Sequence, residues 1–112
     1  MSQIEIPFSR DMYNAAYHGH KVATTRSEAK GEIGDVFHLY RDNNPKNPKE
    51  YFVPKFRIIE IMAVDLETVR DLYFRLEGFD SPESFEKTWR ALHRGHFTTG
   101  KLYFMHIFGR MV

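Results

Sequence analysis

The 112 residues of the chain are enough for one domain, 1–112, built on a single core. Hydrophobic residues make up 42% of the chain and aromatic residues 15%, which excludes an intrinsically disordered protein. The absence of cysteine excludes disulfides and a thiolate nucleophile, and a formal net charge of +1 favours no particular partner. No apolar run reaches membrane-spanning length and no signal pattern opens the chain, so we expect a soluble, cytoplasmic protein without membrane contacts.

The first predicted element is a short helix with Ser9 as its N-cap. It runs to about His18 and is closed by Gly19. A short strand follows over residues 21–26, and a Gly-Asp turn leads into a second strand over residues 36–41. Asn-Pro pairs and charges over residues 42–50 predict an exposed loop. Residues 51–64 form a long strand that is apolar on both faces near Ile58, Ile59 and Ile61, as expected of a central strand.

Two consecutive helices follow in the second half. Asp65 caps the first, whose apolar residues recur at helical spacing until it stops at Gly78. Ser81-Pro82 starts the next helix, which ends at Gly95, and residues 101–108 form a last strand. Three helices and about five strands without regular β-α alternation predict an α+β fold. Because the strands are apolar on both faces, a small closed β-barrel flanked by helices is the economical arrangement.

The first predicted strand carries three reactive or anion-binding side chains, those of Lys21, Thr24 and Arg26. Arg26 carries a planar charged group suited to phosphate or carboxylate. The Thr24 hydroxyl can bind a ligand or, if a base removes its proton, attack a carbonyl, and a desolvated Lys21 can be that base. An exposed strand with solvated charges is the alternative interpretation. Glu77 is the next candidate because an acid at a helix C-terminus opposes the helix dipole, although a surface ion pair also accounts for it.

The C-terminal quarter has a distinct charge pattern. Residues 87–112 contain five basic residues and no acid, and Arg90 and Arg94 lie at the end of the third helix. This pattern predicts a basic face for a polyanion, with an ordinary solvated helix face as the alternative. Two pairs of histidines, His18 with His20 and His93 with His96, lie around glycines without helical ligand spacing, so we predict no metal site. Four aromatic residues are candidates for stacking on bases or for the core: Tyr51, Phe52, Trp89 and Phe97.

The order of these features resembles the ASCH domain, a member of the PUA-like superfamily. The residues that carry the resemblance are Gly19, Lys21, Thr24 and Arg26, then Gly34-Asp35, Glu77-Gly78-Phe79, Ser81-Pro82-Glu83-Ser84-Phe85, Trp89 and Leu92-His93. The resemblance covers nearly the whole chain. It implies a small PUA-like barrel surrounded by helices, with a cleft between them in which ASCH domains are proposed to bind RNA.

The same resemblance implies candidate activities. One small bacterial ASCH branch hydrolyses cytidine acetylated on its exocyclic amine, and its lysine, threonine and glutamate match Lys21, Thr24 and Glu77. Small ASCH proteins are also linked to RNA cleavage. We therefore expect recognition of RNA or a modified nucleoside, with Arg26, Arg90 and Arg94 as ligand-binding residues and no cofactor. The alternatives are an acetylcytidine amidohydrolase, a small ribonuclease, or a regulatory module that binds a metabolite.

Overall fold

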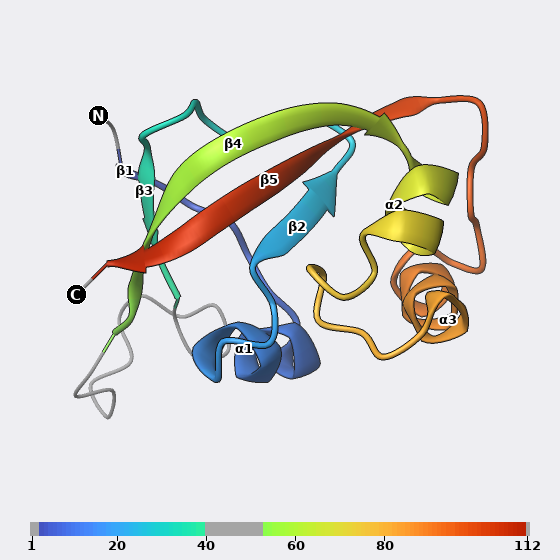
Figure 1. Cartoon of the computed structure of the whole chain (residues 1–112), viewed down its shortest axis with the longest axis horizontal. Helices are drawn as coiled ribbons and strands as arrows, with labels where there is room; N and C mark the ends of the chain where they lie inside the picture. Colours follow the sequence, from blue (N-terminus) through green and yellow to red (C-terminus); the bar gives the residue numbers. More distant parts are fainter. Residues whose placement is uncertain (1–2, 40–52, 112) are drawn as a thin grey trace.

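The computed structural model describes residues 3–39 and 53–111. These residues form a five-stranded mixed sheet with three helices (Figure 1). In chain order the elements are β1 (Gln3–Ile4), α1 (Arg10–Tyr17), β2 (Ala23–Arg26), β3 (Val36–His38), β4 (Lys55–Asp65), α2 (Leu66–Leu72), α3 (Pro82–Leu92) and β5 (Leu102–Met111). The predicted α+β class is confirmed. The predicted loop over residues 42–50 and the start of the predicted strand over residues 51–64 lie outside the described residues.

The sheet has the strand order β1-β3-β4-β5-β2 and is built on the long antiparallel pair of β4 and β5. β1 pairs in parallel with β3, and the remaining neighbours are antiparallel. The expected closed barrel is not observed, because within the described residues β1 and β2 are the two edges of the sheet. The backbone N–H groups of Val22 and Ala23 donate instead to the carbonyl of Leu76, at 2.8 and 2.9 Å. The turn after α2 therefore occupies the β2 edge where a barrel would need another strand.

The predicted helix starts are confirmed by their caps. The side-chain oxygens of Ser9, Asp65 and Ser81 each accept from a backbone N–H three residues further on, at 3.4, 2.9 and 3.1 Å. The end of the second helix is predicted wrongly, because α2 stops at Leu72 and not at Gly78. The residues between form turns that carry the Leu76 carbonyl to β2.

A β-bulge between Ile58 and Glu60 changes the faces of β4. Ile58 is fully buried, whereas Ile59 is 57% exposed. The expectation that this strand is apolar on both faces therefore fails at Ile59, which lies on the exposed face with Arg57, opposite Phe56 and Ile58. The extra residue of the bulge interrupts the alternation only after Ile59, because Glu60 is exposed as well. The strand is still central, as predicted, with β3 on one side and β5 on the other.

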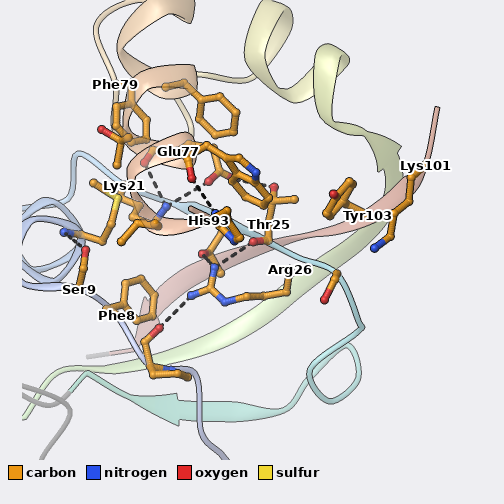
Figure 2. Close-up of a pocket in the computed structure, with 18 residues that line it drawn as sticks. Phe8, Ser9, Lys21, Thr25, Arg26, Glu77, Phe79, His93, Lys101 and Tyr103 are labelled. Carbon is orange, nitrogen blue, oxygen red and sulfur yellow. Dashed lines mark hydrogen bonds and ion pairs between the residues drawn. The ribbon is translucent and has the colours of Figure 1, made fainter. Parts of the chain in front are cut away.

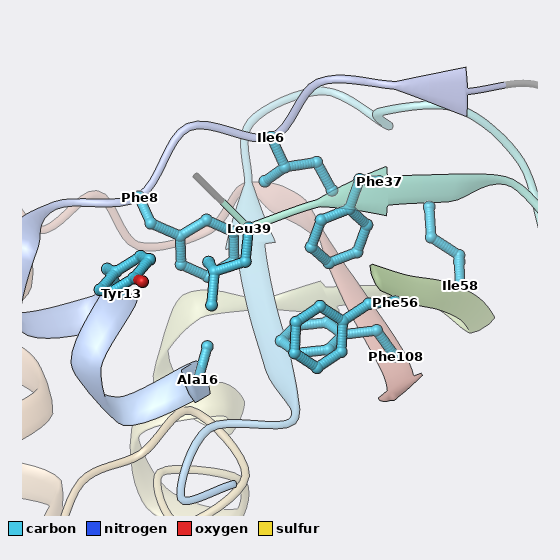
Figure 3. Close-up of a cluster of buried hydrophobic side chains, with 9 residues drawn as sticks. All are labelled: Ile6, Phe8, Tyr13, Ala16, Phe37, Leu39, Phe56, Ile58 and Phe108. Carbon is cyan, nitrogen blue, oxygen red and sulfur yellow. The ribbon is translucent and has the colours of Figure 1, made fainter. Parts of the chain in front are cut away.

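The core has two clusters at opposite ends of the sheet. In the first, the rings of Phe37, Phe56 and Phe108 pack beside α1, with centroids 5.2–5.5 Å apart (Figure 3). The second packs α2 and α3 against β5 and includes Phe85 and Trp89. Edge-to-face and offset ring contacts of this kind add to the burial of apolar area and fix the positions of the helices. In the described part of the chain, no helix combines the length and hydropathy needed to cross a bilayer.

Candidate functional site

A pocket of about 440 Å³ lies between the two core clusters. Its sides come from the segment before α1, from β2, from the turn after α2 and from α3 (Figure 2). Phe8 of the first cluster and Phe85, Trp89 and Tyr103 of the second all line it. The pocket is therefore a gap between two separately packed halves of the core, and the sheet edge at β2 is its floor.

Lys21 and Glu77 form a buried ion pair in this pocket. The Lys21 Nζ lies 3.2 Å from Glu77 Oε1 and 3.1 Å from the backbone carbonyl oxygen of Glu77. Their side chains are only 3% and 4% exposed. Burial lowers the pKa of Lys21 because it disfavours the charged ammonium, and the nearby Glu77 carboxylate offsets part of this effect. A lysine with a lowered pKa next to a carboxylate is typical of sites that move protons.

Gly78 allows the chain to bring Glu77 to this position. Its φ of +96° lies in the left-handed region, and a Cβ there would be 3.1 Å from the Lys21 Cβ and 3.3 Å from the Ala15 Cβ. Only glycine combines this backbone conformation with such a close approach. The Glu-Gly pair singled out in the sequence is thus a structural requirement of the ion pair.

Two threonines of β2 line the pocket with different partners. Thr25 Oγ1 donates to Glu77 Oε2 at 2.9 Å, whereas Thr24 Oγ1 accepts from the guanidinium of Arg26. The structure therefore brings Lys21 and Glu77 into direct contact and places Thr24 in the same pocket, but within the described residues its hydroxyl makes no hydrogen bond to either. Thr25 is a polar residue of the site that the sequence motif did not single out. The signal that could have found Thr25 was the alternation of the strand, which places it on the same face as Lys21 and opposite Thr24.

Arg26 connects β2 to the segment before α1. Its guanidinium donates to the carbonyl oxygens of Thr25 and Pro7, at 3.0 and 2.9 Å, and lies 5.8 Å from the ring centroid of Phe8. Arg26 therefore lines the pocket and links the wall formed by β2 to the wall formed by the segment before α1. Arg90 and Arg94 lie outside the pocket-lining residues. The Arg90 guanidinium is held by the Glu86 carboxylate at 3.0 Å.

The opposite wall of the pocket is aromatic. Trp89 stacks on His93 with the ring centroids 4.1 Å apart and 12° between the planes, and it meets Tyr103 edge-on at 5.5 Å. Phe79 meets Phe85 edge-on at the same distance. These contacts hold flat apolar surfaces in fixed orientations above the polar floor, an arrangement suited to a flat ligand with a polar edge.

His106 supports the floor from behind and is fully buried. Its Nε2 accepts from the backbone N–H of Lys30 at 2.8 Å, so its Nδ1 carries the proton that is donated to the Thr24 carbonyl at 3.2 Å. Both ring nitrogens are therefore occupied when the ring is neutral. Burial lowers the pKa of His106, with the positive charge of Arg26 acting in the same direction.

Among the described residues that the sequence suggested for metal binding or for stacking on bases, Trp89 and His93 line this pocket. Within residues 3–39 and 53–111, no three histidine, aspartate or glutamate side chains gather as a metal site would require. Tyr51 and Phe52 lie outside the described residues. The guanidinium groups of Arg70 and Arg90 lie 5.2 and 5.5 Å from the ring centroid of Phe97.

Comparison with known proteins identifies the fold. The structure matches an ASCH domain of Lactobacillus crispatus with a TM-score of 0.71 and 14% sequence identity, over 97% of this chain and 78% of that one. It also matches a protein of Enterococcus faecalis from the family DUF984, with a TM-score of 0.62 and 13% identity, over 98% and 75% of the two chains. No family model and no curated protein matches the sequence. The chain therefore has the ASCH fold, and the resemblance drawn from its motifs is confirmed at the level of fold.

Proposed function

We propose that the pocket binds a nucleoside, either free or as an unpaired residue of RNA. The observation that carries this proposal is the pairing of an aromatic wall at Trp89 with a buried polar floor at Lys21 and Glu77. A nucleobase has two apolar faces and an edge of hydrogen-bond donors and acceptors, so it matches both surfaces at once. The volume of about 440 Å³ also lies in the range of small-ligand pockets.

The polar floor offers both kinds of hydrogen-bonding group. The Glu77 carboxylate accepts, the Lys21 ammonium donates, and the threonine hydroxyls can do either. These groups favour a base edge that presents a donor beside an acceptor, as the amine and ring nitrogen of cytosine do. Because the floor is desolvated, a polar group of the ligand that meets it without forming a hydrogen bond loses its hydration without compensation, and such a ligand binds more weakly.

Fluorescence titration of the wild-type protein with cytidine and acetylcytidine tests this proposal. Trp89 is the only tryptophan of the chain and lines the pocket, so its emission reports occupancy directly. We expect a saturable change with the wild type and a large loss of affinity in the Lys21→Met variant. Lys87→Met, which removes a lysine outside the pocket, is the matched control and should bind like the wild type. No saturable change with any nucleoside would overturn the proposal.

Amide hydrolysis is the second candidate, favoured by the presence in one pocket of a lysine whose pKa is lowered by burial, a carboxylate and hydroxyl groups. In this reaction a threonine hydroxyl attacks the acetyl carbonyl of acetylcytidine, and the pocket supplies the proton transfers. The family resemblance assigns these roles to Lys21, Thr24 and Glu77. Incubation with acetylcytidine followed by mass spectrometry should show loss of the acetyl group with the wild type and not with Lys21→Ala. Absence of turnover by the wild type would leave binding as the function of the pocket.

A further inference from the structure

The pocket carries more positive than negative charge. Lys21, Arg26 and Lys101 line it, whereas Glu77 is the only carboxylate among the described residues of its lining. Lys21 and Glu77 compensate each other in the buried ion pair of the floor. The guanidinium of Arg26 donates to neutral oxygens of β2 and of the segment before α1. The Arg26 donors are thus already engaged, and Lys101 is left as the cation of the pocket that an anionic ligand can reach.

Lys101 lies at the mouth of the pocket, away from the floor. It is exposed, and Figure 2 shows it beside Tyr103 at one end of the pocket. It directly precedes β5 and lies beyond the end of β2, because Arg26, the last residue of β2, is paired with Phe104. Its ammonium lies 4.9 Å from the ring centroid of Tyr103. No carboxylate in the described part of the chain forms an ion pair with it.

The order of groups along this wall matches the order of groups in a nucleotide. The ring of Trp89 meets the ring of Tyr103 edge-on at 5.5 Å, and the Tyr103 ring in turn holds the ammonium of Lys101 at 4.9 Å. In a nucleotide the base is followed by one sugar ring and then by phosphate. A base placed against Trp89 therefore brings its sugar beside Tyr103 and its phosphate within reach of Lys101.

The connection between α3 and β5, which ends at Lys101, is anchored to the helices. The guanidinium of Arg90 donates to the carbonyl oxygen of Gly95 at 2.8 Å. The ring of Phe97 lies 5.2 and 5.5 Å from the guanidinium groups of Arg70 and Arg90. The backbone that carries Lys101 is thus in place before a ligand arrives. Binding of a phosphate has to order only the lysine side chain, which keeps the entropic cost low.

We infer that Lys101 and the ring of Tyr103 form a phosphate subsite at the mouth of the pocket, so that the pocket prefers a nucleoside monophosphate to the unphosphorylated nucleoside. This inference rests on the proposed binding of a nucleoside by the floor and by Trp89. A lysine ammonium binds phosphate as a compact point charge, without the fixed geometry that a guanidinium requires. Because Lys101 is exposed, dissolved salt screens its attraction for the phosphate.

Fluorescence titration with cytidine, cytidine 5′-monophosphate and cytidine 3′-monophosphate tests the subsite. At low salt we expect the wild type to bind one of the two monophosphates at least about tenfold more tightly than cytidine. Lys101→Met keeps an unbranched side chain against Tyr103 but removes the charge, and it should reduce this preference to less than about threefold. Lys101→Arg, which keeps the charge, should retain most of it. The preference of the wild type should also shrink as salt rises.

Lys87→Met is the matched control, because Lys87 is also an exposed lysine but lines a separate groove beside Arg10. It should keep the preference of the wild type. Loss of the preference in Lys87→Met and not in Lys101→Met would place the phosphate in that groove and overturn the inference. Equal affinities of the wild type for cytidine and both monophosphates would overturn the subsite alone and leave nucleoside binding standing. If neither cytidine nor a monophosphate gives a saturable change, the proposed function and the subsite both fail.

Discussion

At the scale of single residues, the buried pair of Lys21 and Glu77 shapes the site more than any other contact. Each side chain gave up its hydration on folding and is now compensated by the other, with the Glu77 backbone carbonyl and the Thr25 hydroxyl as further hydrogen-bond partners. A pair of this kind adds little net stability over apolar residues of similar volume, but removal of one partner leaves an uncompensated charge in the interior. The pair is therefore better explained by what it does in the pocket than by what it contributes to folding.

A double-mutant cycle tests this view of the pair. Lys21→Met should lower the free energy of unfolding by about 3 kcal/mol, because Glu77 is left buried without its cation. Adding Glu77→Leu to that variant should restore most of the loss. Equilibrium denaturation of the four proteins measures the coupling. A double variant that is as unstable as the sum of the single ones would contradict a direct interaction between the two side chains.

His106, which lies behind the floor of the pocket, makes the free energy of unfolding depend on pH. Its pKa is lowered by burial, so below its ordinary value of 6.5 the unfolded chain binds a proton that the folded one does not. Above pH 6.5 the neutral His106 ring makes its full contribution to the free energy of unfolding. That contribution is lost as the pH falls through the lowered pKa of the folded protein.

Denaturation of the wild type between about pH 8 and pH 5 should show this loss, with a smaller slope in His106→Gln. His18→Gln, which changes an exposed histidine, is the control and should follow the wild type. Equal slopes for the wild type and His106→Gln would show that another group causes the dependence.

At the scale of elements, the turn after α2 connects the fold to the site. Its Leu76 carbonyl occupies the edge of β2, and the next residue is Glu77. The same segment thus keeps the sheet from closing and places the carboxylate in the pocket. Gly78 permits both, because it adopts a positive φ and because it has no Cβ that would crowd Lys21 and Ala15.

Gly78→Ala tests the role of this turn. We expect a loss of about 1–2 kcal/mol in unfolding free energy from backbone strain, and in addition weaker nucleoside binding because the new Cβ displaces Lys21. Gly95→Ala is a matched control, since its φ is also positive, at +83°, but a Cβ there meets nothing within 4 Å. It should lose stability without losing affinity. Equal affinity losses in the two variants would show that the contact with Lys21 has no part in binding.

The elements also show what the sequence could predict. The helix starts at Ser9, Asp65 and Ser81 were predictable because a cap is a local interaction within one turn. The open sheet was not predictable, because it depends on which distant segment of the chain reaches the β2 edge. The contact of Thr25 with Glu77 spans 52 residues and was unpredictable for the same reason. The bulge between Ile58 and Glu60 likewise depends on the register with β5.

At the scale of the whole molecule, the basic residues of the last quarter of the chain are dispersed. Arg90 is paired with Glu86, Arg110 donates to the carbonyl of Tyr17 in α1, and Lys101 lines the pocket. Partners of this kind reduce the charge available to a polyanion, and the distribution favours a pocket ligand over an extended phosphate track.

Nucleoside binding should therefore be nearly independent of salt. Across a tenfold rise in salt concentration we expect the affinity for cytidine to change by less than about twofold, since no phosphate contact is involved. An RNA held through several phosphates would lose about 10³-fold over a comparable rise. Titration at several salt concentrations separates the two cases. A steep loss of affinity for the nucleoside would show that screened ionic contacts dominate its binding, and would contradict binding in the buried pocket.

The position at which a nucleoside binds tests most directly whether the pocket is the binding site. Amide chemical shifts of the labelled protein, followed by NMR during titration with cytidine, report the residues that the ligand affects. We predict shifts concentrated in β2, at Glu77 and Gly78, and along the Phe85–Trp89 face of α3. Shifts confined instead to the groove around Arg70, Glu86 and Arg90 would contradict the assignment of the pocket as the binding site.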